Sequence, residues 1–392
     1  MEEAVIVSAK RTPIGDFCGM LKDYSAVELG TAALKGAISA GGIEAGLIEE
    51  VIGGQVYQAG CKGNTARQIA LAADCSDETV ALTINQQCPS SLRAVEMMAQ
   101  NIMLGKMEVG AVVGYESMTN VPHLIQGARS GYKLGGGKIV DGLLHDALID
   151  AFNGYHMGIT AENLAQEYDI SREEQDAFAL QSHERACQAA SAGRFTDEII
   201  PLEIKTKKGI EQAVKDEHPN PETSLERLAE LKPAFKSDGT VTAGNASSLN
   251  DGAAAVIVMS KTKAEQLGLQ PMAKITASAS AAVNPKVMGI GVVPAVEKVL
   301  KLAGVGQEAI DNWEINEAFA AQFLAVNREL KLNLDKVNVH GSGISLGHPV
   351  GCTGVRLLVS LLTVMEHRQL KRGCATLCAG GGPAAAMIVE RF

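Results

Sequence analysis

Cys88 stands where a thiol could act as a nucleophile. It follows the short run 82–87, which we expect to form a buried strand, and it precedes Pro89-Ser90-Ser91, which we expect to open a helix. The first turn of a helix offers free backbone N–H groups and the positive end of the helix dipole. Both favour the thiolate, so the sequence predicts a lowered pKa for this thiol.

Three side chains far downstream supply other groups that acyl transfer uses. Asn316 stands in Asn-Glu-Ala-Phe, His348 in Gly-His-Pro-Val-Gly, and Cys378 comes just before a run of three glycines. Covalent acyl transfer needs a nucleophile, a base and donors for an oxyanion. Because an imidazole can take a thiol proton near neutral pH, we expect His348 to act as the base for Cys88.

Composition narrows the class of protein. The 392 residues suit two or three domains, and the net charge of −10 argues against a nucleic-acid binder. We expect neither a secretory signal nor a membrane span, because Met1-Glu2-Glu3 leads straight into a short strand-like run and no apolar run approaches ~20 residues. The eight cysteines are scattered without a Cys-x-x-Cys pair, which indicates a reducing cytoplasm and no structural zinc site.

The same order of predicted elements occurs twice in the chain. Strand-like and helix-like segments alternate, which predicts an α/β fold. After Cys88 comes a helical pattern and then the strand-like segment 110–114; after His348 comes a second helical pattern and then the strand-like segment 375–378. Two such halves would bring Cys88 and His348 face to face. The polar, glycine-rich region 121–245 between them is predicted to be an insertion that carries binding residues.

Together these motifs, with Val-Ile-Val-Ser-Ala-Lys-Arg-Thr-Pro at residues 5–13, resemble the thiolase family and, within it, the acetyl-CoA C-acetyltransferases. The resemblance covers essentially the whole chain. It implies two similar α/β halves that form a layered core, with an inserted loop domain. The expected parts are a first half at 1–120, a loop domain over the coenzyme A site at 121–245, a return to the first half at 246–270, and a second half at 271–392.

The resemblance also implies a role for each reactive group. Cys88 would be the nucleophile, His348 its base, and Cys378 the group that takes a proton from the α-carbon of the second acetyl group. The N–H groups of Cys88 and Gly380 would form one oxyanion site. Asn316 would orient a water that forms a second oxyanion site with His348.

Further residues match the family's substrate contacts. Glu317 would orient surrounding groups, and Met157 and Met288 resemble the methionines that shorten the acyl pocket, which points to short acyl chains. The expected substrate-binding residues are His156, Met157, Ser247, Leu148, Phe235, Ala318, Phe319 and Met288.

Two positions depart from the family pattern. Most thiolases have Cys-Gly-Ser-Gly at the nucleophile, whereas this chain has Cys88-Pro89-Ser90-Ser91. Proline is tolerated at the first helical position, and the added ring and hydroxymethyl group are expected to reshape the acyl pocket. Asn220 stands where many relatives have an arginine that faces the nucleotide of coenzyme A. The loss of that charge is expected either to weaken coenzyme A binding or to shift the contact to other residues.

The resulting hypothesis is a thiolase that condenses two acetyl-CoA to acetoacetyl-CoA and CoA, and runs the reverse thiolysis, through an acyl-cysteine. No cofactor or metal is expected, because coenzyme A is substrate and product. The expected partners are acetyl-CoA, acetoacetyl-CoA, CoA and further copies of the chain in a dimer or tetramer.

Other interpretations fit parts of the sequence. A thiolase for longer, branched or aromatic β-ketoacyl-CoAs fits the same motifs. Gly-Ile-Ser-Leu-Gly around Ser345 matches the nucleophile elbow of α/β-hydrolases, but no separate acid and histidine follow it. A dinucleotide-binding turn would need glycine at Leu346, and a β-ketoacyl synthase would be expected to have histidine at Asn316. An inactive acyl-CoA-binding scaffold is supported only by the altered turn after Cys88.

Overall fold

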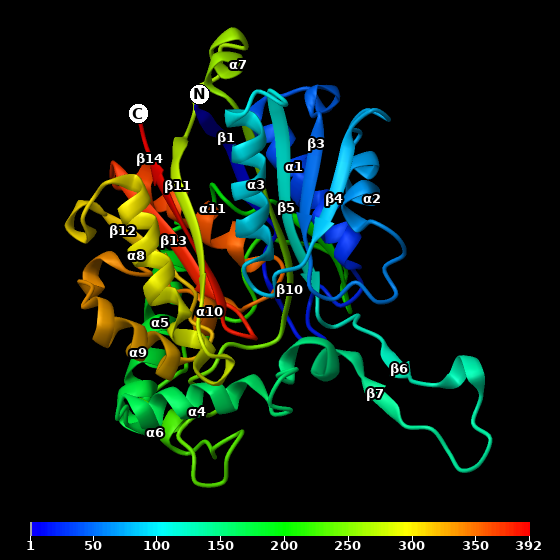
Figure 1. Ribbon diagram of the computed structural model, residues 1–392, viewed down its shortest axis with the longest axis vertical. Helices are drawn as coiled ribbons and strands as arrows, with labels where there is room; N and C mark the ends of the chain where they lie inside the picture. Colours follow the sequence, from blue (N-terminus) through cyan, green and yellow to red (C-terminus); the bar gives the residue numbers. More distant parts are fainter. Residues whose placement is uncertain (1) are drawn as a thin grey trace.

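The computed structural model describes residues 2–392 and is built around one long mixed sheet (Figure 1). The strand order is β12-β13-β14-β11-β1-β10-β5-β3-β4, with the short β2 paired to β10. β3 runs parallel to β4 and β5, and β12 runs parallel to β13, while the central pairs are antiparallel. The strands are β1 (Ala4–Arg11), β2 (Gly15–Asp16), β3 (Glu50–Gly54), β4 (Val80–Ile84), β5 (Val109–Ser117), β10 (Asn250–Ser260), β11 (Ala273–Ala282), β12 (Asn312–Ile315), β13 (Arg372–Cys378) and β14 (Pro383–Glu390).

Two helices join the halves of the molecule. α3 (Ser90–Met103) and α11 (Thr353–His367) pack against each other, and their apolar side chains share one core with strands from both halves. The sequence predicted one apolar face for α11, yet every residue from Thr353 to Met365 is buried. A helix enclosed on all sides buries its whole circumference, so α11 acts as the centre of the structure.

The remaining helices cover the outer faces of the sheet. α1 (Ala26–Gly41) and α2 (Thr65–Ala72) pack on the first half, where a capping box at Ser25 and Glu28 starts α1. α8 (Val292–Ala303) packs on β11 and β14 of the second half, next to α9 (Ala320–Leu330). α7 (Lys261–Gln266) follows β10 and leads into β11.

The strand before Cys88 corrects one expectation. The run 82–87 was expected to be a buried strand, but β4 ends at Ile84 and lies at the edge of the sheet. Val80 and Leu82 on it are 62% and 40% exposed. Apolar β-branched residues fit either an edge or a central strand, so the composition of this run did not reveal its position.

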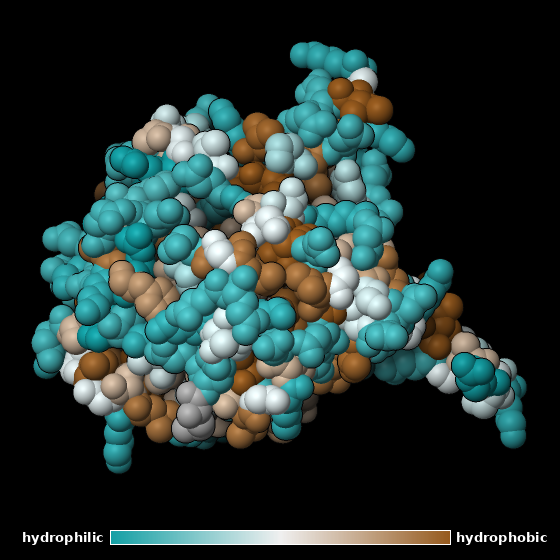
Figure 2. All heavy atoms as spheres, turned by 90° about the horizontal axis from the view of Figure 1, so that it is seen from above, coloured by the Kyte–Doolittle hydropathy of each residue, from teal (hydrophilic) through white to brown (hydrophobic). Residues whose placement is uncertain are grey.

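Residues 121–245 leave the sheet and return to it at β10. They include β6 (His123–Ile125) and β7 (Ile139–Asp141), a hairpin that stands clear of the body (Figures 1 and 2). Several large apolar side chains on this hairpin arm are exposed, among them Ile125, Leu134 and Ile139. The rest comprises η3 (Leu144–Leu148), α4 (Met157–Glu167), α5 (Arg172–Ser191), β8 (Leu202–Thr206), β9 (Gly209–Ala213) and α6 (Leu225–Ala229).

The inserted segment packs mainly against the second half. α4 contacts α9 and η4 (Pro285–Gly291), and α5 contacts α9 and the short α10 (Gly343–Leu346). The domain boundaries expected from the sequence stay a prediction. Among residues 2–392, no helix combines the length and the apolar character that a membrane crossing requires.

Candidate active site

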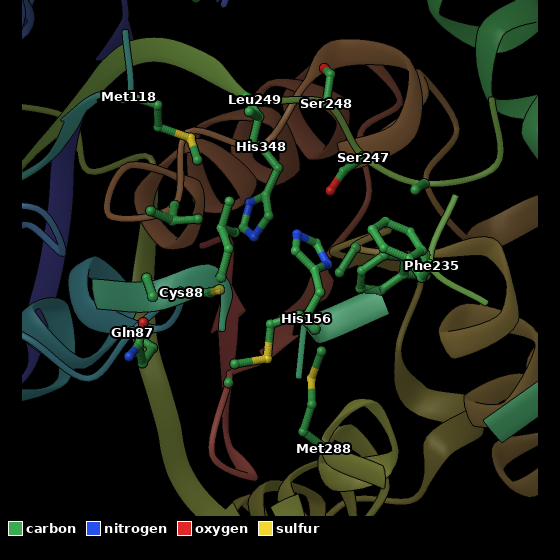
Figure 3. A pocket seen from close by; sticks show the side chains of 18 residues that line it. Gln87, Cys88, Met118, His156, Phe235, Ser247, Ser248, Leu249, Met288 and His348 are labelled. Atoms are coloured by element: carbon green, nitrogen blue, oxygen red, sulfur yellow. The ribbon is translucent and has the colours of Figure 1, made fainter. Parts of the chain in front are cut away.

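One cavity collects side chains from both halves and from the insertion (Figure 3). Eleven of the thirteen predicted site residues line it: Cys88, Leu148, His156, Met157, Phe235, Ser247, Met288, Ala318, Phe319, His348 and Gly380. The other two are buried outside this lining: Asn316 lies beside His348, and Cys378 belongs to the same apolar cluster as Met157. Sequence motifs more than two hundred residues apart therefore meet in one place.

Cys88 lies in a tight turn between β4 and α3. Gln87 takes a left-handed conformation (φ 58°), and its N–H donates to Asn85 Oδ1 at 2.8 Å. Pro89 is the residue before the first helical residue rather than the first one itself, with φ −72° and ψ −1°. The Ser90 hydroxyl accepts the Gln86 N–H at 2.8 Å and donates to the Gln87 carbonyl at 2.5 Å, which closes the turn.

Both serines after Pro89 bond to the backbone, although only Ser91 departs from the usual motif. Besides the turn held by Ser90, Ser91 Oγ accepts the N–H of Val355 at 3.0 Å and so ties the start of α3 to α11. Both side chains are fully buried, and the cavity lining in the described chain contains neither of them nor Pro89. Pro89 and Ser91 therefore do not line the acyl pocket directly. The expectation that they reshape it stays a prediction, and any such effect would act through the turn that holds Cys88.

The pKa of Cys88 departs from the expected direction. Burial raises the pKa of this thiol to about 12, because the charged form is poorly solvated in the apolar cavity. The N–H groups of Cys88 and Gly380 interact with the sulfur and lower the pKa, but by less than burial raises it. Both N–H groups are directed at the Cys88 sulfur, and their role as an oxyanion site stays a prediction.

His348 is a buried imidazole whose Nδ1 has a fixed partner. Nδ1 lies 2.6 Å from Thr353 Oγ1, and that hydroxyl donates to the Pro349 carbonyl at 2.9 Å. Since a hydroxyl has one proton, Thr353 must accept from Nδ1–H, which leaves Nε2 free to take a proton. Burial, and then the nearby Arg356, lower the pKa of His348 to about 3, so the imidazole is neutral at physiological pH.

Asn316 lies beside this imidazole, and the neighbouring Glu317 bonds to other buried groups. Asn316 Nδ2 lies 3.3 Å from His348 Nε2, and its buried Oδ1 has no hydrogen-bond partner within residues 2–392. Glu317 accepts from Ser182 Oγ at 2.6 Å and from Asn338 Nδ2 at 2.8 Å. A buried amide with an unused oxygen is suited to hold a water beside Nε2.

Cys378, the second thiol, ends β13 and is 2% exposed. Burial raises the pKa of the Cys378 thiol, and the neighbouring Cys88 raises it further. A Cβ atom added to Gly380 would come within 2.7 Å of Met157 Cε. Met157 Cε is the end of a flexible side chain, so a larger residue at Gly380 would displace Met157 within the cavity.

Aromatic rings form another part of the cavity lining. The His156 ring stacks on Phe235 with centroids 4.5 Å apart, and Phe319 meets Phe235 edge to face at 6.1 Å. His156 Nδ1 accepts the Gly158 N–H at 3.0 Å and caps α4, and burial lowers the pKa of His156. Its Nε2 is left as the donor that can face a thioester carbonyl (Figure 3).

Asn220 lies in a neighbouring cleft that shares Ala246 with the cavity. Its N–H donates to His183 Nδ1 at 3.2 Å, and its side-chain oxygen accepts the Glu222 N–H at 2.9 Å. The side-chain oxygen thus shapes its own loop. The expected effect on coenzyme A binding at this position stays a prediction.

The hydrolase alternative finds no site. Ser345 is fully buried in α10, its hydroxyl lies 2.8 Å from Ser182 Oγ, and the described lining of the cavity does not include it.

Sequence reasoning missed several residues of the site. Gln87, Met118, Leu249 and Val350 also line the cavity. Thr353 holds the His348 ring, and its place five residues after His348 in the same motif was an available signal.

Comparison with known proteins supports the resemblance along the whole chain. Residues 4–262 match the model of the thiolase N-terminal domain and residues 269–391 that of the thiolase C-terminal domain. A Pseudomonas aeruginosa protein named acetyl-CoA acetyltransferase is 50% identical over 392 residues, covering 100% of both chains. The Escherichia coli protein of that name is 47% identical over 393 residues, again covering 100% of both.

Solved structures agree with these relatives. The acetyl-CoA acetyltransferase of Syntrophomonas wolfei superimposes with a TM-score of 0.98 at 46% identity and covers 100% of both chains. The human mitochondrial 3-ketoacyl-CoA thiolase in complex with CoA superimposes with a TM-score of 0.96 at 41% identity, covering 100% of this chain and 98% of that one.

Proposed function

This chain belongs to the thiolase family, and on that premise we propose that it is an acetyl-CoA C-acetyltransferase. It condenses two acetyl-CoA to acetoacetyl-CoA and CoA, and it catalyses the reverse thiolysis. The observation that carries this proposal is that Cys88 and His348 line one cavity, with Cys378 close to Cys88 and the Gly380 N–H directed at the Cys88 sulfur. The names of the full-length relatives support acetyl-CoA as the substrate.

The first half of the reaction acylates Cys88. His348 Nε2 takes the thiol proton as the sulfur attacks the acetyl carbonyl, and the N–H groups of Cys88 and Gly380 stabilise the oxyanion. The CoA thiolate then leaves and takes the proton of Cys378. Because both thiols are protonated at rest, this transfer leaves Cys378 as the thiolate and His348 as the imidazolium.

The second half forms the carbon–carbon bond. The Cys378 thiolate removes a proton from the α-carbon of a second acetyl-CoA, and the enolate oxygen is stabilised by protonated His348 and the water held by Asn316. The α-carbon attacks acetyl-Cys88, and the released Cys88 thiolate takes its proton from His348. All three groups return to their starting states, so CoA serves as substrate and product and no further cofactor takes part.

Met157 and Met288 at the cavity support a short acyl group. Their unbranched side chains occupy space that a longer acyl chain would need. If acetoacetyl-CoA is not cleaved, longer, branched or aromatic β-ketoacyl-CoAs become the substrates to test.

We also propose that the chain forms a homotetramer in the cytoplasm. The exposed edge of β4 and the apolar residues of the hairpin arm support self-association, since both would be covered by another copy. The eight cysteines are all free within the described chain, and the proposed chemistry needs reduced thiols, which supports a reducing compartment. Light scattering of the purified protein tests the tetramer.

The activity is tested by CoA-dependent cleavage of acetoacetyl-CoA, with Cys88→Ser and Cys378→Ser beside the wild type. We expect both variants to lose cleavage. Exchange of labelled CoA into acetyl-CoA uses only the first half of the reaction, so Cys378→Ser should retain more of it than Cys88→Ser. Full cleavage by Cys88→Ser would contradict the proposal.

A further inference from the structure

The turn that carries His348 belongs to the second half of the chain, yet two buried side chains from the first half hold it. Asn250 is the first residue of β10, and Glu116 lies near the end of β5. Both are 0% exposed. The first accepts the N–H of His348 itself and the second accepts the N–H of Gly351, three residues later.

Asn250 fits closely beneath the turn. Its Oδ1 accepts the His348 N–H at 2.9 Å and the Ser248 hydroxyl at 2.7 Å. Its Nδ2 donates to the Gly15 carbonyl at 3.1 Å and to Asp16 Oδ1 at 3.2 Å. The amide therefore uses both of its ends, which fixes its orientation and that of the group it holds.

The turn is shaped to admit this side chain. Gly347 has φ 98°, and a Cβ atom there would lie 2.5 Å from Asn250 Cγ. A positive φ and the absence of a Cβ are both properties of glycine. Gly347 therefore leaves the space that the Asn250 side chain occupies.

Glu116 holds the other side of the turn and also reaches the surroundings of Cys88. Its Oε2 accepts the N–H groups of Gly351 at 3.0 Å and Val56 at 2.9 Å, and its Oε1 accepts that of Tyr57 at 3.1 Å. Val56 and Tyr57 belong to the apolar cluster against which Cys88 packs. The Glu116 carboxyl group therefore connects the turn that carries His348 to the residues that pack around Cys88.

We propose that Asn250 and Glu116 are positioning residues that set the His348 imidazole against Cys88. This inference rests on the proposed function. Neither side chain is among those that line the cavity in the described chain, so both would act through the turn rather than on the substrate. Two hydrogen bonds to N–H groups three residues apart restrain the turn against tilting. A shift of about 1 Å in a reacting group can cost roughly a hundredfold in rate.

The experiment compares variants that remove or keep the anchoring acceptor. Asn250→Ala removes it, while Asn250→Asp keeps an oxygen for the His348 N–H but loses the donor to Gly15. Glu116→Gln retains one acceptor oxygen, and Glu116→Ala none. Asn327→Ala is the matched control: its Oδ1 also accepts a loop N–H, that of Leu332 at 3.0 Å, at the far end of α9.

Two readouts are measured for each folded variant: kcat and KM for acetoacetyl-CoA cleavage, and the rate at which iodoacetamide alkylates Cys88. We expect Asn250→Ala to lower kcat roughly a hundredfold with KM within about twofold. Asn250→Asp should recover part of kcat, and Glu116→Gln should exceed Glu116→Ala. Alkylation should slow in the same order, and Asn327→Ala should match the wild type in both readouts.

The inference is overturned if Asn250→Ala keeps kcat within about threefold of the wild type, or if the loss appears in KM alone. If Asn250→Ala does not fold, the Asn250→Asp and Glu116→Gln variants decide in the same way. If the wild type itself does not cleave acetoacetyl-CoA, the proposed function fails, and the alkylation rates still decide whether these residues position His348.

Discussion

The two helices that meet at the centre, α3 and α11, begin next to the two reactive side chains, but their starts are built differently. The Cys88 end is open: the thiol is half-buried, it follows the edge strand β4, and it adjoins a left-handed residue. The His348 end is closed, and the imidazole is only 6% exposed. Thr353 bonds to the ring, Asn250 accepts the His348 N–H, and Glu116 accepts an N–H later in the same turn. The nucleophile must be reached by substrate, whereas the base must be held still.

The largest effect is expected from removing the base at the closed end. His348→Asn keeps a polar side chain of smaller size but cannot take the thiol proton. We expect kcat for acetoacetyl-CoA cleavage to fall by about 10³-fold, within the range typical of general bases. Steady-state kinetics measure this, with circular dichroism as the check on folding. A loss below tenfold would mean that His348 is not the base.

A smaller effect is expected from the group that orients the base. Thr353→Val has nearly the same shape but offers Nδ1 of His348 no acceptor. We expect a loss of about 10- to 100-fold in kcat, as for other partners that fix an imidazole. Thr353→Ser keeps the hydroxyl and should stay close to the wild type. Equal losses in the valine and serine variants would show that packing, not the hydrogen bond, matters.

The difference between the two ends also predicts a pH dependence. Burial raises the pKa of Cys88 to about 12 and lowers that of His348 to about 3, so the resting pair is neutral rather than thiolate and imidazolium. The thiolate fraction should therefore rise about tenfold per pH unit well below the pKa of the thiol. Alkylation of Cys88 by iodoacetamide, measured from pH 6 to 9, should climb throughout. A plateau reached by pH 7 would indicate a resting ion pair.

The smallest effect is expected from relieving strain at the open end. Gln87 has φ 58°, which costs an L-residue about 1 kcal/mol and glycine almost nothing. Since glycine also makes the unfolded chain more flexible, Gln87→Gly should stabilise the protein by at most about 1 kcal/mol. Chemical denaturation measures the change. A loss of stability larger than about 1 kcal/mol would show that the Gln87 side chain contributes more than its backbone strain costs.

Local features of the sequence predicted the helix starts, the strands that follow them and the convergence of Cys88 with His348. They did so because each motif places its reactive group beside glycine or proline at the start of a helical pattern. The sequence predicted a lowered pKa for Cys88 because the start of a helix can be recognised in a sequence. The burial that raises this pKa cannot be recognised there. The edge position of β4 follows from strand order, which composition does not encode.

Asn250 and Glu116 were missed for a related reason. Each stands at the end of a strand far along the chain from His348, and its partners are backbone N–H groups that leave no mark on the sequence. Only the packing of one half on the other brings them under the turn. Thr353, by contrast, lies within the histidine's own motif and was open to prediction.

The central claim is that Cys88 carries the acyl group. The most direct measurement is peptide mass spectrometry of the wild type after brief incubation with acetyl-CoA and acid quenching. The account predicts one acetyl group per chain on the peptide that contains Cys88, absent from Cys88→Ser and removed by added CoA. Acetylation of another cysteine, such as Cys378, with Cys88 unmodified would contradict it.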